Sequence, residues 1–311
     1  MAEAAPPDMF RQLLDRSAGH APLPTAVAHP CDASSLAGAV EAAQAKLIDP
    51  ILVGPEAKIR AVAAAAGLDI SAYRLEPAAH SHAAAARAVA LVRAGEASML
   101  MKGSLHTDEL MHEVVAADSG LRTARRISHA FLMDVQTYPR PFLITDAAIN
   151  VAPSLMDKVD ILQNAIDLAH VLGIEQPRVA ILSAVETVTP KLPSTIDAAA
   201  LCKMADRRQI TGALVDGPLA FDNAVNVAAA QEKGIVSEVA GRADILMVPD
   251  LESGNMLVKQ LTFMAGAEAA GLVLGARVPV VLTSRADSPA ARVASCAMGV
   301  LLAASRPPVV A

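Results

Sequence analysis

The chain has 311 residues, 53% of them hydrophobic and only 2% aromatic, and its net charge is −6 at pH 7. An aliphatic core is expected, and the lack of a basic face interleaved with aromatic residues excludes nucleic acid as an expected partner. No apolar run reaches the roughly 18 residues of a membrane span. The amino terminus is acidic, unlike that of a signal peptide, and the chain has three cysteines that are not at metal-binding spacing. Both observations favour the reducing cytoplasm.

Stretches with apolar residues at helical spacing alternate with short β-branched runs from the amino terminus onward. In the first half, Asp32 and Thr107 are expected N-caps, and Gly67 and Gly95 are expected to end two helices. The expected helices of this half are 9–16, 33–46, 58–66, 81–94 and 107–117, and the expected strands are 25–28, 51–55, 97–101, 127–135 and 141–145.

The second half repeats the alternation. Ser154 is the expected cap of an amphipathic helix, and Ser194 with Asp197 three residues later matches a variant of the capping box. Ser288 is an expected N-cap, with Pro289 at the first helical position, where an N–H would be unbonded anyway. The expected helices are 157–172, 194–205, 222–231, 256–265 and one that begins at 289, and the expected strands are 178–183, 212–215, 244–248, 272–274 and 278–282.

This alternation indicates an α/β protein with mostly parallel sheets flanked by helices. The composition changes near 150–153 without a low-complexity linker, and the final strand and helix are expected to return to the first domain. We therefore expect two lobes with the active cleft between them. One consists of residues 1–150 plus 278–311, and the other of residues 151–277.

Four polar turns follow expected strands, at 102–104, 216–218, 250–255 and 283–288. Ligands of open α/β sheets bind outside the carboxyl ends of the strands, where helix N-termini favour anions. Each turn also has an ordinary explanation as a solvated turn or a helix cap, and in the last turn Arg285 and Asp287 would form a surface ion pair. The usual phosphate-loop, dinucleotide and nucleophile-elbow motifs are absent from the sequence.

Four segments in chain order resemble the phosphate acetyltransferase and phosphate butyryltransferase family, over a span from about Asp49 to Leu302. The Met-Lys-Gly and Ser-Arg-Ala-Asp-Ser motifs are closer to the butyryl branch of this family. In the acetyl branch an arginine follows shortly after the strand that corresponds to 97–101, whereas this sequence has Lys102 there and no arginine before Arg122. The resemblance also implies a fold like that of isocitrate and isopropylmalate dehydrogenases. The four segments are MLMKGSLHTDELM (Met99–Met111), DGPLAFDNAVN (Asp216–Asn226), ADILMVPDLESGNMLVKQL (Ala243–Leu261) and VPVVLTSRADS (Val278–Ser288).

The resemblance implies reversible transfer of a short acyl group, acetyl to butyryl, between coenzyme A and inorganic phosphate, without a metal or a bound cofactor. A thiol that attacks an acyl phosphate needs a base, and the phosphate and the oxyanion need cations and donors. The residues implied by the motif match are Asp287 as the base, Arg285 and Ser284 at the phosphate and the oxyanion, Ser288 and Lys102 as further phosphate contacts, and Gly254, Asn255 and Lys259 on the coenzyme A side.

Two alternatives stay open. One is an NAD(P)- and metal-dependent dehydrogenase of the related fold, which needs clustered aspartates. The other is a non-catalytic acyl-CoA sensor, against which the pair of Arg285 and Asp287 argues. A homodimer or higher homo-oligomer is expected, because an apolar surface helix at 256–265 needs a partner.

Overall fold

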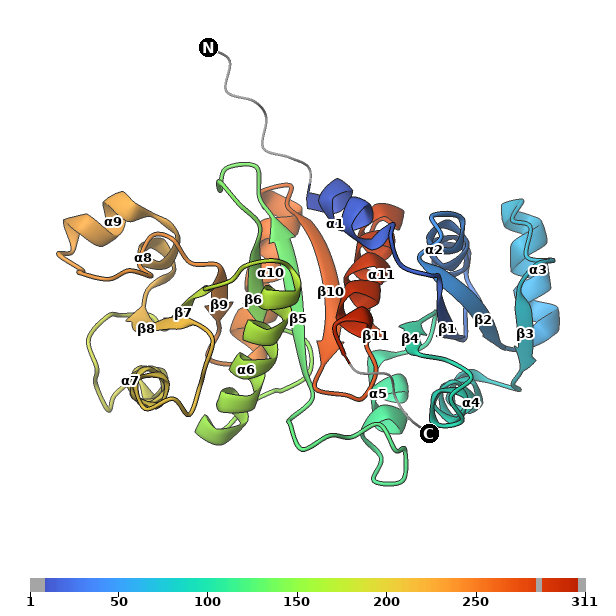
Figure 1. Cartoon of the computed structure of the whole chain (residues 1–311), viewed down its shortest axis with the longest axis horizontal. Helices are drawn as coiled ribbons and strands as arrows, with labels where there is room; N and C mark the ends of the chain where they lie inside the picture. The colour runs from blue at the N-terminus through green and yellow to red at the C-terminus, as the bar shows by residue number, and fades with distance from the viewer. Residues whose placement is uncertain (1–8, 284–286, 307–311) are drawn as a thin grey trace, which may run out of the picture. The chain divides into compact units, whose positions relative to one another are not determined.

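A computed structural model of the chain describes residues 9–283 and 287–306. The chain folds into two compact units, whose helices and strands are labelled in Figure 1. We name them the split unit, Pro7–Ile127 with Ala270–Ala311, and the central unit, Met1–Pro6 with Ser128–Ala269.

The chain enters the central unit at Ser128 and returns to the split unit at Ala270. The boundaries predicted from the sequence are at 151 and 278. Residues 128–150 go with the central unit because β5 (Ser128–Asp134) and β6 (Phe142–Thr145) form an antiparallel pair, and β6 runs parallel to β9 (Ile245–Met247). The predicted α/β class, with mostly parallel strands flanked by helices, is confirmed.

The sheet of the split unit has the strand order β3-β2-β1-β4-β11-β10, and only β10 is antiparallel to its neighbour in this unit. Figure 1 shows α1, α2 and α11 over one face of this sheet and α4 and α5 over the other. The helices are α1 (Met9–Ser17), α2 (Ala33–Gln44), α3 (Glu56–Ala66), α4 (Ser81–Arg93), α5 (Thr107–Val115) and α11 (Pro289–Ala304), and the strands are β1 (Leu23–Ala28), β2 (Ile48–Gly54), β3 (Arg74–Pro77), β4 (Met99–Lys102), β10 (Glu268–Leu274) and β11 (Val280–Val281).

The sheet of the central unit has the order β5-β6-β9-β7-β8, and its strands are parallel apart from the β5–β6 pair. Its apolar core joins residues of β6, β7 and β9 to residues of α8, α9 and α10. Its other elements are β7 (Arg178–Leu182), β8 (Leu214–Leu219), α6 (Leu155–Val171), α7 (Pro193–Asp206), α8 (Phe221–Val225), α9 (Val227–Glu232) and α10 (Leu251–Met264).

Two predicted helix starts are confirmed. Ser154 and Asp157 form a reciprocal capping box at the start of α6, with each side chain bonded to the other residue's backbone N–H. Ser288 caps α11 by accepting a hydrogen bond from the N–H of Ala291 at 3.1 Å, and Pro289 occupies the first helical position.

The capping box predicted at the start of α7 is wrong. The helix begins at Pro193, one residue earlier than expected. The Ser194 hydroxyl lies 2.9 Å from that of Ser183, and the Asp197 carboxylate accepts from the Lys158 ammonium at 2.6 Å. Tertiary partners therefore take both side chains away from the helix terminus.

Five further differences concern the elements and their boundaries. The cap of α5 is His106, not Thr107. The sequence did not predict β3, and residues 216–218, predicted as a turn, lie within β8. The helix expected over 222–231 is broken at Asn226, whose side chain caps α9. Because Asp250 caps α10, the helix starts five residues before the expected position.

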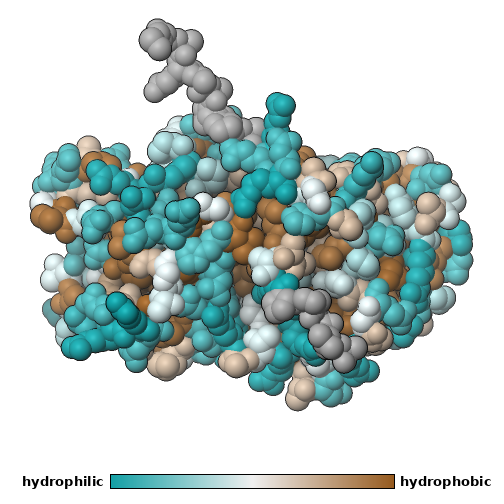
Figure 2. All heavy atoms as spheres, viewed as in Figure 1, coloured by the Kyte–Doolittle hydropathy of each residue, from teal (hydrophilic) through white to brown (hydrophobic). Residues whose placement is uncertain are grey.

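Aliphatic side chains fill both units, as the composition predicts. Figure 2 shows hydrophilic residues over much of one face, with apolar residues scattered among them. Large apolar side chains stay exposed on α10, where Met256, Phe263 and Met264 are 64%, 72% and 81% accessible. Among the described residues, none of the helices combines the length and the apolar character needed to cross a membrane.

Candidate active site

Three parallel strands bring distant segments of the chain to one edge of the split unit's sheet. Ala28 at the end of β1 pairs with Lys102 at the end of β4, and Val281 of β11 pairs with Met101. The segments that follow these strands therefore lie together at the carboxyl edge. This edge contains the predicted 102–104 turn and the approach to the predicted 283–288 turn.

Lys102 joins two of these segments directly. Its side chain is buried, with the residue only 5% exposed. The Nζ atom donates to the carbonyl oxygens of Gly103 and Thr283, each at 3.4 Å. Burying an ammonium group is costly unless it is hydrogen-bonded, so these contacts fix the charge at the edge. The sequence interpretation of Lys102 as a solvated turn residue is therefore wrong.

The turn after Lys102 is held by the backbone of β1. The N–H groups of Gly103 and Ser104 donate to the carbonyl oxygens of Ala28 and His29, both at 2.9 Å. A Cβ atom on Gly103 would collide with both of these oxygens, so only glycine fits here. The Ser104 hydroxyl also donates to the His29 carbonyl at 2.8 Å and accepts from the N–H of Cys31 at 3.2 Å.

His29 is a member of this edge that the sequence analysis missed. It has a φ of 55°, in the left-handed region that non-glycine residues rarely adopt. Its Nδ1 lies 3.2 Å from the Ser104 hydroxyl, and desolvation, followed by the nearby Lys58 charge, lowers its pKa. His29 directly follows a strand, as the four predicted turns do, and this position in the sequence could have identified it as a candidate site residue.

The amino end of α11 carries the predicted base and one predicted phosphate contact. Asp287 is half-buried and immediately precedes the cap residue Ser288. The Ser288 hydroxyl is exposed and already accepts the capping hydrogen bond. The N-terminal end of this 16-residue helix favours negative charge beside it. Ser284 and Arg285, predicted at the phosphate and the oxyanion, lie outside the described residues.

Two further polar residues lie near this edge. Thr283, which belongs to the predicted 283–288 turn, is 3% exposed, and its Oγ1 has no hydrogen-bond partner among the described residues. Arg292, one turn into α11, is 2% exposed and packs against Gly38 of α2. The sequence analysis missed Arg292, which falls within an apolar helix and therefore has no sequence signal.

The residues predicted on the coenzyme A side all lie on α10 of the central unit. Gly254 is buried, and a Cβ there would meet Val248 Cγ2 at 2.7 Å and the Ala147 side chain at 3.0 Å. Asn255 donates to the Ala147 carbonyl oxygen at 3.3 Å. Lys259 is exposed one turn further on, so it shares a helix face with Asn255.

The turn beside Gly254 is organised by a buried carboxylate. Asp146 accepts hydrogen bonds from the N–H groups of Ala148, Ile149 and Asn150 and from the Asn150 side chain. Desolvation raises the pKa of Asp146 in spite of these donors. Within residues 9–283 and 287–306, no three His, Cys, Asp or Glu side chains are grouped so as to hold a metal ion.

Comparison with known proteins gives consistent matches. The family model described as "Phosphate acetyl/butaryl transferase" matches residues 78–300. A phosphate acetyltransferase of Rhizobium meliloti is 63% identical over 97% of this chain and 96% of the relative. A phosphate butyryltransferase of Clostridium acetobutylicum is 42% identical over 84% and 86%. The crystal structure of a branched-chain phosphotransacylase from Enterococcus faecalis V583 covers 90% of this chain and 99% of that chain at 29% identity, with a TM-score of 0.78.

Proposed function

The chain belongs to the phosphate acetyl/butyryl transferase family, and from this premise we propose how its residues move a short acyl group between coenzyme A and inorganic phosphate. The observation that carries the proposal is the contact between Lys102 and Thr283. It holds a buried cation beside the segment that leads to Asp287, at the sheet edge where ligands of such folds bind.

The chemical step needs a thiolate and a stabilised oxyanion. Asp287 takes the thiol proton of coenzyme A, and the sulfur forms a bond to the acyl carbon of the acyl phosphate. The bond from that carbon to the bridging oxygen then breaks, and inorganic phosphate leaves with the electron pair. The reverse direction uses the same groups, with phosphate oxygen as the nucleophile and the protonated Asp287 returning its proton to sulfur.

The anionic groups need fixed positive charge in a site with little water. We assign Lys102 and the amino end of α11 at Ser288 to the phosphate, together with Arg285 and Ser284, which precede Asp287 in the chain. On the central unit, we assign Asn255 and Lys259 to coenzyme A. Gly254 supports them by letting α10 approach the 146–147 turn, and its direct contact with coenzyme A stays a prediction.

The acyl chain length stays open between acetyl and butyryl. The relative named phosphate acetyltransferase is more similar to this chain than the relative named phosphate butyryltransferase, at 63% against 42% identity. The identity values therefore favour the acetyl branch, whereas the Met-Lys-Gly motif favours the butyryl branch. We therefore propose acetyl-CoA as the first substrate to test.

We further propose a homodimer or larger homo-oligomer and a cytoplasmic location. The exposed apolar side chains of Met256, Phe263 and Met264 on α10 favour a partner copy that covers them. The three free cysteines, two of them buried, are consistent with a reducing compartment.

The test is release of free thiol from acetyl-, propionyl- and butyryl-CoA, with and without inorganic phosphate. Release that requires phosphate, with acyl phosphate as the second product, is the expected result. Release without phosphate would indicate a hydrolase. If none of the three acyl-CoA substrates releases thiol, the acyl-CoA sensor and the dehydrogenase would become the favoured functions.

A further inference from the structure

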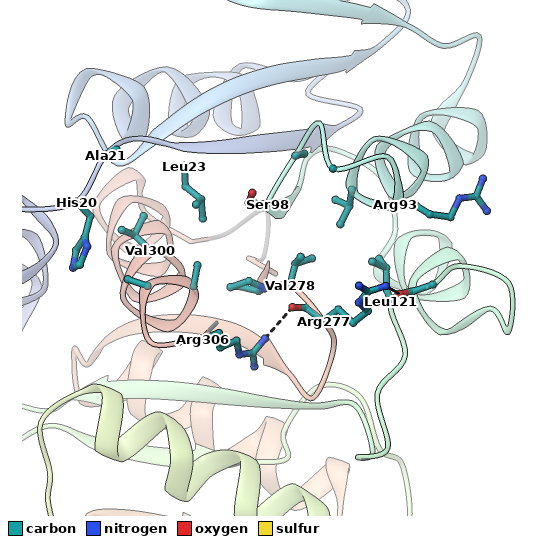
Figure 3. A pocket seen from close by; sticks show the side chains of 17 residues that line it. His20, Ala21, Leu23, Arg93, Ser98, Leu121, Arg277, Val278, Val300 and Arg306 are labelled. Atoms are coloured by element: carbon teal, nitrogen blue, oxygen red, sulfur yellow. Dashed lines mark hydrogen bonds between the residues drawn. The ribbon is translucent and has the colours of Figure 1, made fainter. Parts of the chain in front are cut away.

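A cavity lies within the split unit, at the opposite edge of the sheet from Lys102. It has a volume of about 510 Å³, within the range of small-molecule sites. Its wall is formed where three parallel strands begin, by Leu23 of β1, Ser98 before β4 and Val278 before β11. The carboxyl-terminal turns of α4 and α11 complete it (Figure 3).

The charged residues that line this cavity are all arginines. They are Arg93, Arg277 and Arg306, and no aspartate or glutamate lines the cavity in the described part of the chain. Figure 3 shows Arg277 and Arg306 close to Val278, with His20 and Arg93 at opposite sides of the view. Three guanidinium groups around one cavity give it a positive potential that favours an anion.

Backbone carbonyl groups hold the arginines in place. Arg277 donates to the Gly120 oxygen at 3.1 Å, and Arg306 donates to the Ala276 oxygen at 2.9 Å. Arg93 donates to the Asp118 oxygen at 3.1 Å. A guanidinium group has five N–H donors, and its planar fork suits carboxylate and phosphate alike. These contacts orient Arg277 and Arg306 before any ligand arrives.

The remainder of the wall defines the body of the ligand. It is made mainly of aliphatic side chains, among them Leu23, Val92, Leu121 and Val300, with Ala303 on the helix side. No Phe, Tyr or Trp side chain lines the cavity among the described residues. The wall therefore suits a short aliphatic chain.

The cavity is separate from the candidate active site. Strand β4 runs from this edge to Lys102, and from Ser98 to Lys102 it spans about 13 Å at roughly 3.3 Å per residue. Helix α11 has Ser288 at one end and Ala303 near the other, about 23 Å apart at roughly 1.5 Å per residue. A ligand here cannot touch Lys102 or Asp287.

We propose that this cavity binds a short aliphatic organic anion, whose phosphate or carboxylate is held by Arg277 and Arg306 and whose chain lies against Leu23, Val278 and Val300. The site is additional to the acyl-transfer site, and its ligand undergoes no reaction there. The two possible head groups share the same chemistry and are distinguished by the choice of probe.

The test is isothermal titration of the purified protein with n-butyl phosphate and with butyrate. Inorganic phosphate, which has the charge without the chain, and 1-butanol, which has the chain without the charge, are the two single-feature control probes. At least one of the two organic anions is expected to bind at a Kd at least tenfold below both single-feature probes. Coenzyme A at saturation and Lys102→Met should leave this binding unchanged, which separates it from binding at the acyl-transfer site.

Three variants test the cavity itself. Arg277→Gln combined with Arg306→Gln should raise the Kd at least tenfold, and Ala303→Leu should do so by filling the apolar side without removing a charge. Arg60→Gln, on an exposed helix face of the same unit, is the matched control and should bind as the wild type does. Turnover without the probe should be normal in all three.

Two outcomes would overturn the proposal. One is the lack of binding of either organic anion at about 10 mM, a concentration at which even a weak site with a Kd of about 1 mM is well occupied. The other is binding that survives Ala303→Leu and the double arginine variant alike. If the arginine variant fails to fold, as judged by its melting temperature, Ala303→Leu decides alone. Activity does not enter the readout, so a failure here is distinct from a failure of the proposed acyl transfer.

Discussion

Replacing Lys102 by methionine removes a buried cation while keeping most of the length of the side chain. The hydrogen bonds from Lys102 to the Gly103 and Thr283 carbonyl oxygens are long, at 3.4 Å, and the burial of a charge is relieved at the same time. The free energy of unfolding should therefore change by no more than about 1 kcal/mol. The expected effect is on phosphate.

A hydrogen bond from a charged donor contributes about 1.5–3 kcal/mol. At about 1.4 kcal/mol per factor of ten, loss of the Lys102 contact should lower kcat/KM for phosphate by about 10- to 150-fold. The assay is phosphate-dependent thiol release from acetyl-CoA over a series of phosphate concentrations. A change of the same size in kcat/KM for phosphate and for acetyl phosphate in the reverse direction is also expected, because both carry the group that Lys102 contacts.

Lys203→Met is the control, because Lys203 is exposed and forms a local ion pair with Asp206. It should leave both kcat/KM values unchanged. If Lys102→Met folds normally and its kcat/KM for phosphate stays within threefold of the wild-type value, Lys102 does not contact phosphate and the proposed site is in the wrong place.

Four other changes test separate parts of the structure. Asp287→Ala should lower kcat by at least 100-fold with little change in KM if Asp287 is the base, and near-normal turnover would remove it from that role. Because the pKa of His29 is lowered, the unfolded chain binds more protons than the folded one as the pH falls below about 6.5. Wild-type stability should therefore decline more steeply below pH 6.5 than that of His29→Asn, in which asparagine tolerates the positive φ, and parallel denaturation curves would refute this. Gly254→Ala should destabilise the protein by about 1–3 kcal/mol through overpacking, whereas Gly19→Ala, with open space around it, should not; equal midpoints in urea would contradict the packing argument. Phe263→Asp should shift the mass in solution toward the monomer, and an unchanged mass measured by light scattering would rule out α10 as the interface.

Local chemistry decided which helix starts could be predicted. Ser154 and Ser288 both form the predicted caps, with hydrogen bonds to backbone N–H groups of their own helices. Ser194 and Asp197 follow a similar pattern, but Ser183 and Lys158 approach them from other elements. A capping pattern reflects only what the local chain offers, so it fails where a distant side chain competes.

Two other errors have the same origin in tertiary structure. The segment Arg74–Pro77 has little apolar alternation, and it becomes β3 because β2 offers it a parallel edge. Gly254 reads as a turn residue in the sequence, yet it lies inside α10. It is glycine because the helix packs against Val248 and Ala147 with no room for a Cβ.

In the candidate site, too, local sequence predicted some features and tertiary structure decided the others. The sequence located the 102–104 turn and the approach to Asp287, because each follows a recognisable strand. It did not show which side chains become buried, and so it left Lys102 open between a solvated turn residue and a phosphate contact. Burial depends on the pairing of β1, β4 and β11, which lie far apart in the chain.

The carboxyl edge of the split unit gathers features that each oppose folding. Lys102 is a buried charge, and His29 has a positive φ. Thr283 has a buried hydroxyl with no hydrogen-bond partner among the described residues, and Gly103 admits no side chain at all. The positive φ and the hydroxyl without a described partner each cost about 1–3 kcal/mol, and structures retain such features chiefly where function requires them. A solvated turn would need none of the four, so their concentration at one edge is the strongest physical argument that this edge binds a ligand.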